Sequence, residues 1–322
     1  AEGREPIVGP TPPEDLVRDI DQLPEDHHLV AFDELDVYYA RAHQIPHVLR
    51  ELGRLREITF REVGEGTGKS IDVDDYDQDY MHLFVWNRTD ETLVGAYRFG
   101  QTDVLLEKQG LEGLYTSTLF EYEPELLRQI SPALEMGRAF VRKEYQGSYR
   151  PLLLLWKGIG AYVVAHPRYR YLFGPVSVDN EYQTMSHQLL MQFLKEHSFK
   201  PEFAELVEPK TPFKFRPIQA WDTKALSTVV DDVQEVSSLI DDIERQERGV
   251  PVLLRQYLKL GGELLGFYVD PDFSNVVGGL ILVDLLKTDR SILNRYMGSE
   301  EAAQFLAHHE PEEREARAPE RT

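Results

Sequence analysis

A carboxylate, an arginine and a glycine-containing turn follow one another in the middle of the chain, in an order suited to binding an anion. Glu135 and Arg138 belong to an apolar segment, 134–141, that is typical of a strand. The turn at 146–148 then leads into a helix beginning at Pro151, whose first-turn N–H groups are unpaired. Such a helix end binds phosphate, so the spacing predicts a phosphate site beside this strand. A structural ion pair between Glu135 and Arg138 is the alternative interpretation.

Two other patterns give no support for a site. The sequence GEGTGKS at residues 64–70 is similar to a phosphate-binding loop, but that motif needs glycine where Val63 stands and must follow a strand, whereas this segment follows a helix. We expect a flexible loop there. The histidines show no pair at metal-ligand spacing with a carboxylate nearby, so no metal site is expected. Cysteine is absent, which excludes disulfides and thiolate chemistry and fits a reducing compartment.

Charge separates the chain as a whole from its middle segment. The formal net charge of -21 disfavours nucleic acid and anionic membranes as partners. One stretch, which we call the basic island, has a single acid, Glu144, among seven bases: Arg138, Arg142, Lys143, Arg150, Lys157, Arg168 and Arg170. Because the island coincides with the predicted phosphate site, we expect it to meet an anionic partner. A scattered layout of these side chains is the alternative.

Helices and strands with clear hydrophobic periodicity must position these residues. Segments 134–141, 151–166 and 171–178 read as strand, helix and strand, a βαβ unit that places the helix N-terminus beside the C-terminal edge of the first strand. Helical spacing and strand patterns also predict the remaining elements. These are helices over 45–63, 185–197, 223–248 and 251–260, and strands over 81–86, 93–99, 264–269 and 279–284.

The length fits one large domain over residues 28–306, within which 218–306 could form a C-terminal subdomain. Residues 1–27 are acidic and Pro-rich, and residues 307–322 are charged, so both ends are expected to be tails, the second of them disordered. No apolar run reaches the roughly 18 residues that span a bilayer, and residues 1–13 do not have the basic-then-apolar order of a signal peptide, so secretion is not expected. We expect a cytoplasmic protein with at most peripheral contact with the inner membrane face.

The central segment resembles a known family. The sequence LEMGRAFVRKEYQGSYRPLLLLWKGI, from residue 134, resembles the acyl-donor half of GNAT-fold N-acyltransferases. In particular it looks like the hemolysin-like branch that makes ornithine or glycine lyso-lipids from acyl carrier protein, which is related to the acyl-homoserine-lactone synthases. The segments LRELGRLREITFREVG, DVDDYDQDYMHLFVW and VPVLLRQYLKLGGELLGFYVDPDF extend the resemblance over about residues 28–298. It implies an α/β fold with a GNAT-like mixed, twisted sheet flanked by helices, with extra C-terminal helices and strands.

The resemblance implies an acyl donor bound through its phosphopantetheine arm, with no bound cofactor. The positions that match the family's donor loop are Val141, Arg142, Gln146, Gly147, Ser148, Tyr149 and Arg150. The loop lacks the second glycine that usually cradles the diphosphate of coenzyme A. Acyl carrier protein presents only one phosphate, so we expect it as donor and partner, with acyl-coenzyme A as the alternative.

The remaining site residues follow from what acyl transfer needs. An amine attacks a thioester only when neutral, which makes Glu135 the candidate base, with Arg138 as its catalytic companion. Backbone N–H groups near the end of the same strand, at 140–142, could stabilise the oxyanion. An amino acid acceptor carries an amine and a carboxylate, so both charges are expected around it. The candidates for acceptor binding are Arg56, Asp75, Asp77, Arg98 and Ser177.

Three functions fit these features. The first is an N-acyltransferase that moves a (3-hydroxy)acyl group from acyl carrier protein to the amino group of ornithine, glycine or a similar amino acid, forming a lyso-aminolipid. The second is a noncatalytic module that binds acyl carriers within a lipid-synthesis protein. The third is a coenzyme A-dependent acetyltransferase for a small amine. Release of the carrier thiol, or turnover with acetyl-coenzyme A alone, separates them.

Overall fold

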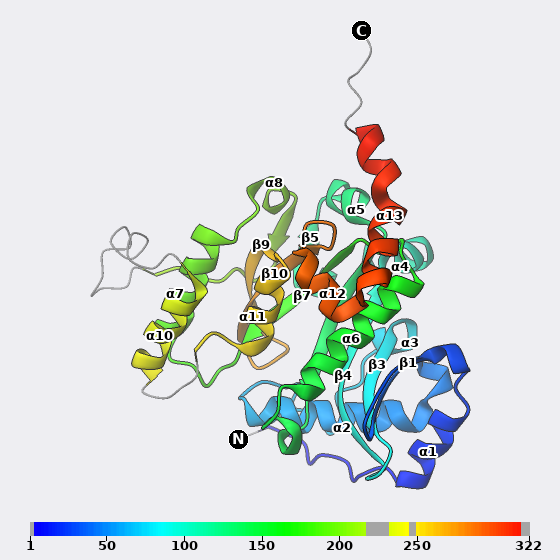
Figure 1. Ribbon diagram of the computed structural model, residues 1–322. Coiled ribbons are helices and arrows are strands. Elements are labelled where there is room, and N and C mark those ends of the chain that lie inside the picture. The colour runs from blue at the N-terminus through cyan, green and yellow to red at the C-terminus, as the bar shows by residue number, and fades with distance from the viewer. Residues whose placement is uncertain (1–2, 217–231, 245–248, 317–322) are drawn as a thin grey trace.

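An eight-stranded mixed sheet runs through the part of the chain that the computed structural model describes, residues 3–216, 232–244 and 249–316 (Figure 1). All neighbouring strands are antiparallel except β6 and β7. In spatial order they are β1 (His28–Phe32), β2 (Leu35–Arg41), β3 (Met81–Asn87), β4 (Thr92–Gln101), β6 (Ala133–Val141), β7 (Tyr171–Val178), β10 (Val276–Asp284) and β9 (Glu263–Asp270). A small second sheet pairs β5 (Phe120–Tyr122) with β8 (Val207–Pro209).

Helices cover both faces of the large sheet. On one face α6 packs its apolar side on β2, β3 and β4, and Gly158 permits close approach, since a Cβ there would lie 2.6 Å from Val37. On the other face α1 and α2 pack together over Phe84 and Trp86. The helices are α1 (Pro13–Asp21), α2 (Pro46–Glu62), α3 (Tyr76–Asp79), α4 (Thr102–Gln109), α5 (Pro124–Ile130), α6 (Arg150–Ala165), α7 (Thr184–His197), α8 (Pro201–Ala204), α10 (Val233–Glu244), α11 (Val252–Lys259), α12 (Arg290–Met297) and α13 (Ser299–Ala316).

The expected mixed α/β architecture is confirmed, including the βαβ unit. Strand β6, helix α6 and strand β7 follow one another, and β6 runs parallel to β7. The predicted hairpin is β3 and β4, and the predicted amphipathic helix is α2. Of the long helix expected over 223–248, the structure describes α10 and the residue before it, and 223–231 and 245–248 lie outside the described residues.

Three expectations about the organisation of the chain are wrong. The segment before residue 28 is no tail, because α1 buries Leu16 and Ile20 against α2. The region 218–306 is no separate subdomain, because β10 pairs with β7 along eight residues and β9 completes the same sheet. The expected C-terminal tail is helical as far as Ala316, within α13, and His309 in this helix is buried; residues 317–322 lie outside the described residues.

Strands β6 and β7 form a fork. Their parallel pairing covers only Ala133–Glu135 opposite Tyr171–Phe173, after which β6 continues along β4 and β7 along β10. Gly174 lies where the strands separate, and a Cβ there would lie 2.1 Å from the Met136 carbonyl oxygen. Just beyond it, Arg138 has a φ of 49° and the β4–β6 register shifts. This bulge turns β6 away from β7 and opens the space that forms the site.

Candidate active site

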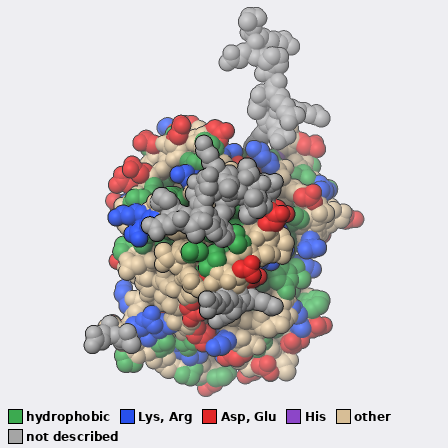
Figure 2. All heavy atoms as spheres, turned by 90° about the vertical axis from the view of Figure 1, so that its left-hand side faces the viewer, with side chains coloured by type: hydrophobic (Ala, Val, Ile, Leu, Met, Phe, Trp, Pro, Cys, Tyr) green, Lys and Arg blue, Asp and Glu red, His purple; other side chains and the backbone are tan. Residues whose placement is uncertain are grey.

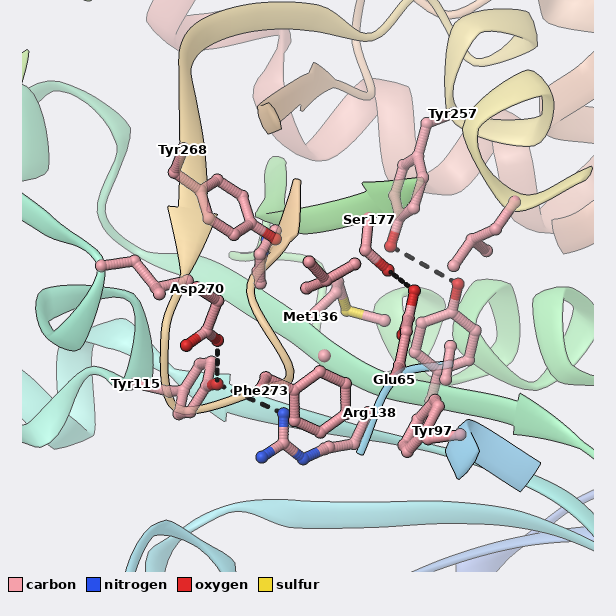
Figure 3. A pocket seen from close by; sticks show the side chains of 17 residues that line it. Glu65, Tyr97, Tyr115, Met136, Arg138, Ser177, Tyr257, Tyr268, Asp270 and Phe273 are labelled. Atoms are coloured by element: carbon pink, nitrogen blue, oxygen red, sulfur yellow. Dashed lines mark hydrogen bonds between the residues drawn. The ribbon is translucent and has the colours of Figure 1, made fainter. Parts of the chain in front are cut away.

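Three adjoining cavities lie along the fork. A central cavity of about 80 Å³ has Met136 and Arg138 of β6 on one side and Ser177 of β7 on the other (Figure 3). A larger opening of about 600 Å³, which we call the apolar cleft, shares with it Phe60, Glu65, Ala139, Ser177 and Leu253. A polar cleft of about 540 Å³ shares with the central cavity Tyr115, Leu119, Arg138, Asp270 and Phe273. The central cavity therefore adjoins two openings of different character.

The apolar cleft contains most of the predicted donor-binding residues. It runs from the N-terminus of α6 to the fork, and its walls include Phe140, Leu152 and Leu155. The predicted donor residues among its lining are Val141, Gln146, Gly147, Ser148 and Tyr149. Local hydrogen bonds fix this turn: the Gln146 side chain donates to the Val141 carbonyl oxygen at 2.7 Å, and the Arg150 N–H donates to Ser148 Oγ at 3.2 Å. The turn at 146–149 and the end of β6 at Val141 thus line the same opening.

The other two predicted donor residues point elsewhere. Arg150 pairs with Glu34 at 2.9 Å, and Arg142 pairs with Glu144 at 3.2 Å; neither is among the lining of the apolar cleft. Within the basic island, acids from distant segments also pair with Arg168 and Arg170. On the face seen in Figure 2, acidic and basic side chains are interspersed. The expectation that the island as a whole faces an anionic partner is wrong, because much of its charge is neutralised within the chain.

The polar cleft offers charges of both signs. Its walls combine three basic side chains with four acids: Lys69, Arg138 and Lys210, and Asp72, Asp74, Asp270 and Asp272. Arg138 reaches it between two aromatic rings, with its guanidinium carbon 4.6 Å from the centroid of Phe273 and 5.0 Å from that of Tyr115. Burial raises the pKa of Asp270, whose carboxylate accepts hydrogen bonds from the Asp272 N–H and Tyr115 hydroxyl. This cleft suits a small molecule that carries both charges.

Three predicted acceptor residues, Arg56, Asp77 and Arg98, belong to a buried ion network behind this cleft. Arg56 donates to Asp77 at 2.9 Å, and Arg98 lies 3.1 Å from the same carboxylate. Burial acts to raise the pKa of Asp77, but the two guanidinium groups lower it below its usual range. These three side chains are at most 1% exposed and belong to neither cleft. Their side chains are therefore not accessible to an acceptor. Instead, they hold the residues that line the polar cleft.

Two aspartates connect this network to the polar cleft. Asp74 accepts two hydrogen bonds from Arg98, at 2.6 and 3.0 Å, and Asp72 pairs with Arg138 at 3.1 Å. The sequence prediction missed both and chose Asp75, which is exposed at the start of α3. Asp74 and Asp77 are three residues apart, and the backbone N–H of each donates to the side-chain carboxylate of the other. Helical spacing within the acidic segment was the available signal for pairing Asp77 with Asp74.

Glu135, the predicted base, is buried and surrounded by donors. Its carboxylate accepts hydrogen bonds from the Tyr80 hydroxyl, the Tyr115 N–H, and the N–H and hydroxyl of Thr116. Burial raises its pKa, while the bonds from Thr116 and Tyr80 oppose that rise. Its partner is not Arg138, which pairs with Asp72, and Glu135 lines none of the three cavities. The structure therefore places it beneath the site, where it holds the segment 115–116.

A carboxylate that the sequence reasoning passed over lies at the fork itself. Glu65 is 5% exposed and accepts a hydrogen bond from the Ser177 hydroxyl at 2.9 Å (Figure 3). Burial raises its pKa to about 7, against the opposing effect of the Ser177 bond. Ser177 is the predicted acceptor residue that does reach the site, and it lines both the central cavity and the apolar cleft. Local sequence gave no signal for Glu65, because a glutamate between Gly64 and Gly66 is typical of an exposed loop.

Hydrogen bonds to Glu57 and Ser274 hold the loop that carries Glu65, whereas we expected a flexible loop. Gly64 and Gly66 have φ values of 74° and 98°, which glycine adopts without strain. The buried carboxylate of Glu57 accepts hydrogen bonds from Thr67 and Gly68, and Ser274 donates to the Gly66 carbonyl oxygen at 2.9 Å. The glycines set the path of the loop, and these contacts fix Glu65 against Ser177.

Comparison with known proteins identifies the family of this chain. A family model described as an acetyltransferase (GNAT) domain matches residues 55–157. A glycine N(alpha)-acyltransferase of Bacteroides thetaiotaomicron is 33% identical over 290 residues, 84% of this chain and 85% of that protein. One of Phocaeicola vulgatus is 31% identical over 275 residues, 80% and 82% of the two chains. The chain belongs to the GNAT N-acyltransferase family that includes these two enzymes, and it is an N-acyltransferase.

The solved structures that this chain matches include two acyl-homoserine lactone synthases described as CoA-dependent. BjaI is 12% identical, with a TM-score of 0.39, over 84% of this chain and 97% of its own. MesI is 13% identical, with a TM-score of 0.36, over 84% and 95%. Among the described residues, no three His, Asp or Glu side chains are grouped as metal ligands. No helix in the described ranges has both the length and the hydropathy to cross a membrane.

Proposed function

We propose that the enzyme transfers an acyl group from a phosphopantetheine thioester to the amino group of a small amino acid, with glycine as the first candidate. The observation that carries this proposal is the meeting of an apolar cleft and a polar cleft at the fork between β6 and β7. The thioester carbonyl would lie at the central cavity, with donor and acceptor approaching from opposite sides. The names of the two curated relatives support glycine as acceptor.

The donor arm fits the apolar cleft. Its mouth lies at the first turn of α6, where N–H groups can bind the pantetheine phosphate. Beyond Glu135, the edges of β6 and β7 no longer pair with each other, so an extended pantetheine could hydrogen-bond between them as an added strand does. The bulge at Arg138 redirects the backbone of β6 at the same place and would aim N–H groups at the oxyanion.

Acyl carrier protein remains our proposed donor, with acyl-coenzyme A as the alternative. Coenzyme A would bring a diphosphate and a third phosphate to the mouth of the apolar cleft. There, Pro151 removes one backbone donor from the first turn, and the guanidinium of Arg150 is engaged by Glu34. A single phosphate needs fewer cationic partners, which favours a carrier protein. A long acyl group would make the product an amphiphile, with peripheral membrane contact at its release.

The acceptor fits the polar cleft. A zwitterionic amino acid needs a cation for its carboxylate and acids near its ammonium group. Arg138 can use the guanidinium N–H groups left over from Asp72 and Tyr115 for the carboxylate, and Asp270 stands across the cleft near the central cavity. Arg56, Asp77 and Arg98 would hold this arrangement from behind. An acceptor with a second ammonium group, such as ornithine, would need a further acid, for which Asp272 is available.

Thiol release tests this function directly. The protein is incubated with 3-hydroxyacyl carrier protein or with acyl-coenzyme A, and with glycine, ornithine and other amino acids, while free thiol and N-acyl product are measured. We expect amine-dependent release of thiol with a carrier protein donor and glycine. Substitution of Arg138 by Met should raise the KM for the amino acid about tenfold or more, since a charge-assisted contact is lost. Thioester that stays intact with every amine would contradict the proposal.

A further inference from the structure

Glu65 occupies a singular position among the described residues that line the site. Five of them line both the central cavity and the apolar cleft: Phe60, Glu65, Ala139, Ser177 and Leu253. Of these five, Glu65 alone carries a group that can take up a proton at neutral pH. It therefore stands beside the place where the thioester of the donor would meet the amine.

The contacts of Glu65 leave it able to accept a proton. One carboxylate oxygen, Oε1, accepts the Ser177 hydroxyl, and no hydrogen bond to Oε2 from another described residue accompanies it. Glu135 differs, because four donors occupy its carboxylate. The loop fixed by Glu57 and Ser274 holds the Glu65 side chain in this direction. A carboxylate with a free oxygen at the reaction site is suited to general base catalysis.

We propose that Glu65 is the general base that deprotonates the attacking amine, an inference that rests on the proposed acyl transfer. The amine nitrogen forms a bond to the thioester carbonyl carbon, and one of its protons passes to Glu65. The C–S bond then breaks, the thiolate leaves, and the proton on Glu65 is returned to it as the thiol. An acceptor that arrives as an ammonium ion first releases its extra proton to solvent.

The charges around Glu65 give this step a pH dependence. The residues that face it from the neighbouring elements are Arg138 of β6, Ser177 of β7, Asp179 after β7, and Tyr268 and Asp270 of β9. Burial and the two aspartates raise the pKa of Glu65, and Ser177 and Arg138 act in the opposite direction, with a result of about 7. The active carboxylate form is therefore lost as the pH falls below about 7, and kcat/KM should fall with it.

The experiment compares thiol release by the full chain and by the variants Glu65→Gln, Glu62→Gln and Asp270→Asn from pH 5 to 9. Glu65→Gln keeps the size and the acceptor oxygen for Ser177, and should lower kcat by about 10² to 10⁴-fold and remove the inflection near pH 7. Glu62→Gln, a matched change on the surface at the end of α2, should leave both unchanged. Binding of a nonreactive acyl-pantetheine thioether measures whether each variant still holds the donor, independently of catalysis.

The rival base is Asp270, which lies on the acceptor side of the central cavity. If Glu65→Gln retains the wild-type rate and inflection, or if only Asp270→Asn abolishes the inflection, the assignment to Glu65 is overturned while acyl transfer itself stands. If the wild-type protein transfers acyl groups to no amine, the proposed function fails instead. The two failures are therefore distinguishable by the wild-type assay alone.

Discussion

Two buried glutamates in this enzyme have opposite surroundings. Glu135 lies on the strand whose sequence pattern first indicated a site, and its carboxylate accepts four hydrogen bonds. Glu65 lies on a glycine-rich loop and accepts one, from Ser177. The four hydrogen bonds to Glu135 make it part of the framework, whereas burial, together with the nearby Asp179 and Asp270, raises the pKa of Glu65 to about 7. A carboxylate's surroundings, more than its place in a pattern, decide whether it can exchange protons.

The largest effect is expected where paired charge is broken. Arg98→Met would leave Asp74 and Asp77 without their shared partner in the interior, and should lower the free energy of unfolding by about 3–5 kcal/mol. Urea denaturation measures it. Arg128→Met breaks an exposed pair with Glu125 that solvent screens, so it should change the free energy of unfolding far less than Arg98→Met does. Equal losses in the two variants would contradict the view that the buried network is structural.

Substitution of Glu135 tests whether this carboxylate has a structural role. Glu135→Ala would leave the N–H and the hydroxyl of Thr116 without their acceptor and should lower the free energy of unfolding by about 3 kcal/mol. Glu65→Ala provides the matched control, because its carboxylate accepts only the Ser177 hydroxyl. A smaller loss for Glu135→Ala than for Glu65→Ala at pH 8 would reverse the comparison.

Stability should depend on pH through Glu65 with a definite sign. Its pKa in the folded protein, about 7, lies above the ordinary pKa of a glutamate, about 4.5, so protonation favours the folded state. The stabilisation is complete below about pH 4.5 and is lost as the pH rises through 7. Glu65→Gln, which stays neutral, should therefore gain up to about 3 kcal/mol relative to wild type at pH 8 and nothing at pH 4. Paired urea titrations at the two pH values measure this; an equal difference at both would contradict it.

A smaller effect is expected from the loop that presents Glu65. Gly66→Ala places a Cβ on a residue with φ of 98° and 3.3 Å from Glu57 Oε1, and should cost about 1–2 kcal/mol. The shift of the loop would also move Glu65, so we expect a fall in kcat that the loss of stability alone does not explain. Gly68→Ala, also at positive φ but 3.8 Å from its nearest neighbour, is the control for strain alone. Equal activity in the two variants would show that the loop need not be held so closely.

Much of the fold follows from periodic patterns in the sequence. The stripe of α2, the hairpin of β3 and β4, and the βαβ unit each bury a continuous apolar face, which local spacing reveals. Helix α1 was missed because only Leu16 and Ile20 of its apolar residues are deeply buried, in an acidic and Pro-rich context. The layout of the basic island could not be predicted, since its partner acids, such as Glu34 and Asp284, are distant in sequence.

The site was predictable on its donor side and much less so elsewhere. Residues 146–149 form one continuous turn, so their grouping is local. Glu65 and Ser177 are 112 residues apart, and their meeting depends on the separation of β6 and β7. A lone glutamate between two glycines looks like a solvated loop residue until that packing is known. Likewise, local sequence did not show which acids between 72 and 79 point inward.

The central claim is that the carboxylate at the fork is poised to exchange a proton near neutral pH. Carbon-13 NMR of glutamate labelled at its side-chain carboxyl, with wild type and Glu65→Gln titrated in parallel, observes that group directly. The account predicts one signal that is absent from the variant and titrates near pH 7. If the signal lost in the variant instead titrates at about 4 to 5, the range of an ordinary glutamate, the claim is contradicted.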